Sequence, residues 1–260
     1  MRSLARLIWN EYLKMIYRTS TLVMCGGLMA LILFSFALDR WYNPFYTGYW
    51  QAVASQSWLS FFIMVMAVIL AGRIIADEFQ WGTIKFLLIR PAGRSRILFV
   101  KYGAVLCFCF FLLMVLFLCS MILNWIFQPQ GVADPSLPSK EENGNGSAVG
   151  MVLKLYALRM VEIAVYAGIS FMISALFKSV ALATGLTFFF MLFGPETANQ
   201  LGTSGFGSYF LFHHTGLSQY AQWNVTESVF SLAESLGVVL IHLAIFYGIA
   251  WIRFTKQDVF

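Results

Sequence analysis

Residues 73–101 read RIIADEFQWGTIKFLLIRPAGRSRILFVK and form the densest patch of charge in the chain. Strongly apolar segments flank this stretch on both sides. Its eight ionisable side chains within 29 residues are Arg73, Asp77, Glu78, Lys85, Arg90, Arg94, Arg96 and Lys101. Ionisable groups are costly inside a bilayer. We therefore expect the stretch to lie at the cytoplasmic membrane face, in contact with a soluble partner.

The composition predicts a membrane protein. Of the 260 residues, 60% are hydrophobic and 11% are charged, whereas ordinary soluble domains are about 25% charged. Membrane spans and their connections use almost the whole length, so no separate soluble domain is expected. The net charge of +5 arises from Lys and Arg beside the apolar segments, which is typical of cytoplasmic loops. We therefore expect no nucleic acid partner.

The hydrophobic pattern predicts an all-α, polytopic fold with six transmembrane helices. The expected spans cover residues 21–38, 58–76, 97–127, 151–177, 180–193 and 232–251. The fifth is short for the roughly 20 residues that a crossing needs, so it either extends past Pro195 or ends early. With six spans, the expected cytoplasmic side holds thirteen Lys and Arg against four outside. Both termini are then cytoplasmic.

Four further segments complete the expected layout. Residues 1–19 carry a polar residue every fourth position and predict an amphipathic helix in the membrane interface; the alternative is a basic flank of the first span. Residues 128–150 are expected to form a flexible outer loop, and residues 195–231 an outer segment of short helices. Residues 77–93 predict a cytoplasmic helix that Asp77 and Glu78 cap, with a passive basic loop as the alternative.

One pattern within the charged stretch resembles a known family. Glu78, Gly82, Thr83, Leu87, Leu88, Pro91, Arg94 and Lys101 match E-x(3)-G-T-x(3)-L-L-x(2)-P-x(2)-R-x(6)-K. This pattern is similar to the coupling region of ABC-2 type permeases, the membrane subunits of many bacterial ABC exporters. Glu11 and Lys14, within L-x-x-N-E-x-x-K, resemble the connecting helix of that family, and residues 254–258 resemble its tail.

The resemblance implies a permease subunit of the bacterial plasma membrane. Such a chain pairs with a second permease copy or a paralogue, and with two ABC ATP-binding subunits that hold ATP and magnesium. No Walker-type G-x-x-x-x-G-K-[ST] motif occurs here, which agrees with ATP hydrolysis on a partner. The implied docking residues for the ATPase subunit are Asp77, Glu78, Phe79, Trp81, Gly82, Thr83, Phe86, Leu87, Pro91 and Arg94.

The implied function is export of a lipophilic or amphipathic substrate. Small family members of this kind serve peptide-antibiotic immunity, peptide or toxin export, or sodium extrusion. Besides the partner proteins and the substrate, membrane lipid is expected to contact the chain. The first, second and fifth spans would line the path between protomers.

Three intramembrane polar residues leave other functions open. Arg159 and Glu162 lie three apart and can pair on one helix face; otherwise a helix beginning near Met160 places both at the outer interface. His242 is expected to be a packing residue rather than a proton or substrate site, and no metal role is expected for His213 and His214. We expect no catalytic, cofactor-binding or metal set. The alternative function is a stand-alone secondary transporter or ion channel.

Overall fold

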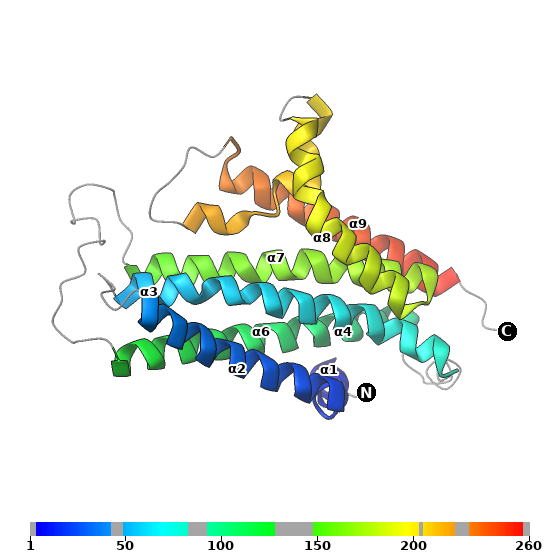
Figure 1. Cartoon of the computed structure of the whole chain (residues 1–260). Coiled ribbons are helices and arrows are strands. Elements are labelled where there is room, and N and C mark those ends of the chain that lie inside the picture. The colour runs from blue at the N-terminus through cyan, green and yellow to red at the C-terminus, as the bar shows by residue number, and fades with distance from the viewer. Residues whose placement is uncertain are drawn as a thin grey trace.

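The computed structural model describes residues 4–42, 49–82, 93–127, 148–202, 205–221 and 229–256, and every regular element within them is helical. Figure 1 shows a bundle of long helices. The α-helices are α1 (Leu4–Ile16), α2 (Thr19–Tyr42), α3 (Tyr49–Ser55), α4 (Ser60–Gln80), α6 (Arg94–Phe127), α7 (Ala148–Phe177), α8 (Val180–Leu201) and α9 (Leu232–Lys256). The short 3-10 helices are η1 (Gln56–Leu59), η2 (Gly205–Tyr209), η3 (Leu211–His213) and η4 (Leu217–Ala221).

Six helical segments are long and apolar enough to cross a membrane. The second of them joins α3, η1 and α4 into one apolar segment of 32 residues, and the others are α2, α6, α7, α8 and α9. The expected all-α, polytopic membrane fold with six spans is therefore confirmed. Helices satisfy their own backbone groups, which is what a hydrocarbon environment requires.

The centre of the bundle is the pair of α4 and α7. In the most apolar part of each span, 67% of the residues are buried in the span that contains α4 and in α7. The corresponding share is 28% in α2, 22% in α8 and 17% in α9. Ser170 and Ser174 of α7 each donate a 2.7 Å hydrogen bond to an α4 carbonyl, at Val68 and Gly72. Small residues allow this close approach, which stabilises helix pairs in membranes.

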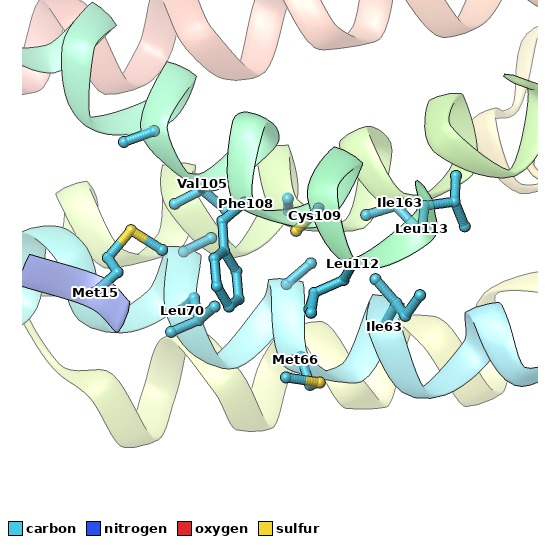
Figure 2. Packing of buried hydrophobic residues seen from close by; sticks show 14 of the residues in the cluster. Met15, Ile63, Met66, Leu70, Val105, Phe108, Cys109, Leu112, Leu113 and Ile163 are labelled. Atoms are coloured by element: carbon cyan, nitrogen blue, oxygen red, sulfur yellow. The ribbon is translucent and has the colours of Figure 1, made fainter. Parts of the chain in front are cut away.

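The third span, α6, covers another side of α4. Figure 2 shows Phe108, Cys109 and Leu112 of α6 directed toward α4, where Leu70 and Ile63 meet them. These side chains are all nearly inaccessible to solvent. Dense packing of this kind holds α4 between α6 and α7.

The N-terminal segment forms the expected helix, α1, which packs on α6. Its apolar side chains Ile8, Tyr12, Met15 and Ile16 contact the buried core that α4 and α6 share. The exposed side keeps Trp9, which is 58% exposed. Aromatic residues of this kind suit a membrane–water boundary.

Several span boundaries differ from those expected, and the second span begins at Tyr49 and not at residue 58. Helix α7 begins at Ala148, well before Met160, so the outer loop cannot include residues 148–150. Helix α8 continues through Pro195 to Leu201, which makes the fifth span 22 residues long and confirms the alternative that it extends past Pro195. A proline within a helix removes one backbone donor and need not end the helix. At the adjacent Gly194, a Cβ would lie 2.5 Å from the Phe212 ring, so glycine lets η3 pack on α8.

The helix termini gather at the two opposite ends of the bundle (Figure 1). Helix α1, the last turns of α4, the start of α6, the α7–α8 turn and the last turns of α9 lie together at one end. There Trp251 of α9 donates through Nε1 to Ser95 Oγ of α6 at 2.8 Å. Helix α3, the end of α6 and the start of α7 lie at the opposite end. An even number of spans places α1 and the end of α9 on the same side.

Candidate functional site

Seven charged side chains gather at the end of the bundle where α1 lies, and we call this group the ion-pair cluster. It joins α1, the turn between α1 and α2, the end of α4 and the start of α6. Its members are Glu11, Lys14, Arg18, Arg73, Asp77, Glu78 and Lys101. The cluster thus connects four parts of the chain that are far apart in sequence.

Lys101 is the buried centre of the ion-pair cluster, with a side chain only 3% exposed. Its Nζ lies 3.3 Å from Glu11 Oε2, 3.0 Å from Glu78 Oε1 and 3.1 Å from the Ile74 carbonyl oxygen. An ammonium group has three donors, and these three acceptors satisfy all of them. A buried charge is tolerated when it is paired in this way. Lys101 therefore fastens α1 and α4 to α6.

Glu11 receives a second cation from its own helix. Lys14 Nζ lies 2.6 Å from Glu11 Oε1 and is largely exposed. Burial alone would raise the pKa of Glu11, but the Lys101 charge and the contact with Lys14 outweigh it, so the pKa lies below its usual value of 4.5. The carboxyl group is therefore ionised at neutral pH and holds both lysines.

Asp77 forms the other half of the ion-pair cluster. Its Oδ2 lies 2.7 Å from Arg18 Nη2 and 3.5 Å from Arg73 Nε, one helical turn earlier. The Arg18 guanidinium also stands over the Trp81 ring, 5.1 Å from its centre, a favourable contact between a cation and an aromatic face. Arg18 thereby fixes the α1–α2 turn to the end of α4.

The α7–α8 turn reaches the same end of α4. Lys178 Nζ lies 4.7 Å from the centre of the Phe79 ring. The backbone of Lys178 has a φ of +55°, a left-handed conformation that is uncommon for any residue other than glycine. The last turn of α4 is thus contacted from the α1–α2 turn, from α6 and from the turn that leads into α8.

The expected helix over residues 77–93 does not begin at Asp77, because Asp77 and Glu78 belong to the last turns of α4. Gly82 has a φ of +69°, the left-handed conformation with which glycine commonly ends a helix. The two carboxylates therefore bind cations near a helix C-terminus and do not cap a new helix. Of the expected docking residues, Asp77, Glu78 and Phe79 lie in α4, Trp81 and Gly82 follow it, Arg94 begins α6, and Thr83, Phe86, Leu87 and Pro91 lie outside the described residues.

Arg159 and Glu162 form the expected pair, in the middle of α7. Arg159 Nη1 lies 2.8 Å from Glu162 Oε2, and Glu162 is 5% exposed. The other carboxylate oxygen of Glu162 accepts a 2.7 Å hydrogen bond from the Ser218 backbone N–H. Both oxygens are occupied, so Glu162 fastens η4 to α7 and leaves little capacity for a transported ion.

The three histidines have structural partners. His242 Nδ1 lies 2.9 Å from the Val238 carbonyl oxygen of its own helix, as expected for a packing histidine. His213 Nε2 lies 3.1 Å from the Gly202 carbonyl oxygen. His214 is buried, with ring nitrogens 2.9 Å from Ser235 Oγ and 2.8 Å from the Ser208 carbonyl oxygen. Within the described residues, no group of three or more His, Cys, Asp or Glu side chains could hold a metal ion.

Sequence reasoning did not foresee the ion-pair cluster as a unit, nor the contact of Lys178 with Phe79. One signal was available for Lys101, which is the fifth residue of the expected third span. A charge inside an apolar segment requires a partner. The identity of its partners depends on how α1, α4 and α6 pack.

The fold and the site together define a multi-pass, all-α membrane protein whose charged groups are paired at one end of the bundle. The chain belongs to the family DUF2705, described as "Protein of unknown function", which it matches over residues 10–260.

Two relatives from Bacillus subtilis (strain 168) align with most of the chain. The "Uncharacterized protein YhcI" is 32% identical over 223 residues, which cover 83% of this chain and 71% of that protein. The "Uncharacterized membrane protein YdbK" is 26% identical over 235 residues, which cover 89% of this chain and 90% of that protein. The second name agrees with the membrane fold.

Proposed function

We propose that this chain is the membrane-spanning permease subunit of an ATP-driven ABC exporter. The observation that carries the proposal is the convergence of Glu11, Glu78 and Lys101 in one buried ion-pair site. All three come from the sequence patterns that resemble ABC-2 type permeases. The arrangement ties both ends of the connection between α4 and α6 to α1, so a force on that connection reaches three helices together.

In this proposal, the end with the ion-pair cluster faces the cytoplasm of a bacterial cell. Residues 77–93 contact an ABC ATP-binding subunit, two copies of which bind ATP and magnesium. A second permease copy or a paralogue completes the transporter. The cargo is a lipophilic or amphipathic compound, such as a peptide, an antibiotic or a lipid-like molecule, that moves out of the cell between the spans.

Site-specific photo-crosslinking tests this proposal. A photoreactive amino acid replaces Trp81, which is 65% exposed and lies beside the ion-pair cluster. In a second variant it replaces Trp41, which is 81% exposed at the C-terminal end of α2, away from the ion-pair cluster. The protein is expressed in its native host, and crosslinked partners are identified by mass spectrometry. We expect a subunit with a Walker-type motif to crosslink at position 81 and not at position 41. If position 81 captures no ATP-binding subunit, the docking role is wrong.

A functional variant follows from the same site. Glu78→Gln removes the negative charge beside Lys101 while keeping the size of the side chain. We expect transport coupled to ATP hydrolysis to fall sharply, because the buried ammonium loses one of its two carboxylate partners. Membrane insertion should not change, because the apolar spans determine it.

A further inference from the structure

A side chain of α7 takes part in the backbone hydrogen bonds of α4. The Ser174 hydroxyl of α7 donates to the Gly72 carbonyl oxygen at 2.7 Å and accepts from the Ala76 backbone N–H at 3.1 Å. Gly72 and Ala76 are the partners that close one regular turn of an α-helix. The hydroxyl therefore bridges the two groups of a single backbone hydrogen bond.

This turn separates two parts of α4 that have different surroundings. On the side of Ser60, the residues Ile63, Ala67 and Ala71 are completely buried in the core. On the other side, residues 77–80 begin with the charged residues Asp77 and Glu78 and end beside Gly82. We call residues 77–80 the terminal arm. In Figure 1 the axis of α4 turns away from α7 over these last turns.

Two features make α4 easier to bend at this turn than elsewhere along the helix. Side chains that insert into the ladder of backbone hydrogen bonds are an established cause of helix bends. Gly72 adds to the effect, since glycine loses more conformational freedom in a helix than other residues do. Neither feature is needed for the ion pairs of Asp77 and Glu78, which lie beyond this turn.

We propose that Ser174 makes the turn from Gly72 to Ala76 a hinge in α4. The Ser174 hydroxyl offers the Ala76 N–H a second acceptor, so the ladder can open there without leaving a buried donor unpaired. The terminal arm then moves as one body together with the ion-pair cluster, while the segment from Ser60 to Gly72 stays packed on α7.

The use of this hinge in transport rests on the proposed function, whereas its existence does not. In an exporter, the hinge determines how much of a displacement of residues 77–93 is transmitted to the rest of the helix bundle. The terminal arm also carries Phe79, which lies under Lys178. Its movement would therefore reach the α7–α8 turn as well.

Hydrogen exchange of the full chain in lipid nanodiscs, without any ATPase subunit, tests the hinge. In the unmodified protein, the amides of the terminal arm should exchange at one common rate, faster than those of residues 60–71. A rate that rises gradually toward Gln80 would indicate fraying from the helix end and would overturn the proposal. This measurement needs no variant.

A matched pair of variants adds a second test. In Ser174→Ala, the Ala76 N–H keeps only the Gly72 carbonyl as acceptor, so exchange in the terminal arm should slow by about fivefold. Ser170→Ala is the control, because the Ser170 hydroxyl donates to the Val68 carbonyl oxygen just as Ser174 does to Gly72. Unlike Ser174, Ser170 accepts no hydrogen bond from a backbone N–H of α4 among the described residues. Unchanged or faster exchange in Ser174→Ala refutes the hinge.

The two proposals fail separately. Exchange is measured on the chain alone, so a hinge without any crosslink at position 81 would leave this inference standing and remove the exporter role. A crosslink at position 81 together with a graded exchange pattern would do the reverse.

Discussion

Lys101 and Lys14 approach the same carboxylate, Glu11, from different environments. Lys101 is 3% exposed and Lys14 is 59% exposed. Lys101→Met leaves two carboxylates without their buried cation, so we expect the free energy of unfolding to fall by about 3 kcal/mol. Lys14→Met should cost less than about 0.5 kcal/mol, because exposed ion pairs contribute little. Thermal unfolding in detergent measures both.

A triple variant is the control for Lys101→Met. Adding Glu11→Gln and Glu78→Gln to Lys101→Met removes the two carboxylates that have lost this cation, so much of the lost stability should return. Equal effects of Lys101→Met and Lys14→Met would contradict the view that burial makes Lys101 the centre of the cluster.

Glu11 also makes stability depend on pH. Its folded-state pKa lies below the usual value of 4.5, so its contribution is fully present above that value and is lost as pH falls through the folded pKa. We expect the melting temperature of the unmodified protein to fall in that acidic range. Glu11→Gln should lack this part of the loss, and identical acid profiles for the two proteins would refute the assignment.

At the scale of helices, Gly72 is the point where three spans meet. A Cβ there would lie 3.0 Å from Ser170 Oγ, 3.1 Å from Thr184 Cγ2 and 3.3 Å from Ala183 Cβ. Gly72→Ala should therefore force α7 and α8 away from α4 and cost roughly 1–3 kcal/mol, the usual range for overpacking.

Gly26 of α2 is the matched control for Gly72, because a Cβ there has nothing within 4 Å. Gly26→Ala should be neutral or slightly stabilising, since alanine has the higher helix propensity. The melting temperatures of the two variants in the same detergent compare them directly. Similar losses for both would mean that close packing at Gly72 is unimportant.

At the scale of the whole molecule, the six spans were predictable because the length of an apolar run is a local property. The boundary errors arose where local signals compete. Asp77 and Glu78 suit a helix start by charge, but Gly82 ends α4 after them. At Pro195 the sequence left both a break and a continuation open, and α8 continues through it.

The candidate site was predictable only in part. The spacing of Arg159 and Glu162 predicted their pair correctly. Glu11 and Lys101 are 90 residues apart, and their contact exists only because α1 packs on α6. The contact of Lys178 with Phe79 likewise depends on where the α7–α8 turn lies. Such pairs follow from the arrangement of helices, which hydrophobic periodicity does not specify.

The shared position of α1 and the end of α9 has a consequence for how copies of this chain can be linked. Because the six spans return the chain to its starting side, a second copy fused directly after the first needs no added membrane crossing and inserts in the same orientation. A single gene that encodes two such copies should therefore yield two bundles with the same orientation in the membrane. The two copies could then carry different substitutions, so one ion-pair cluster could be changed while the other stays intact.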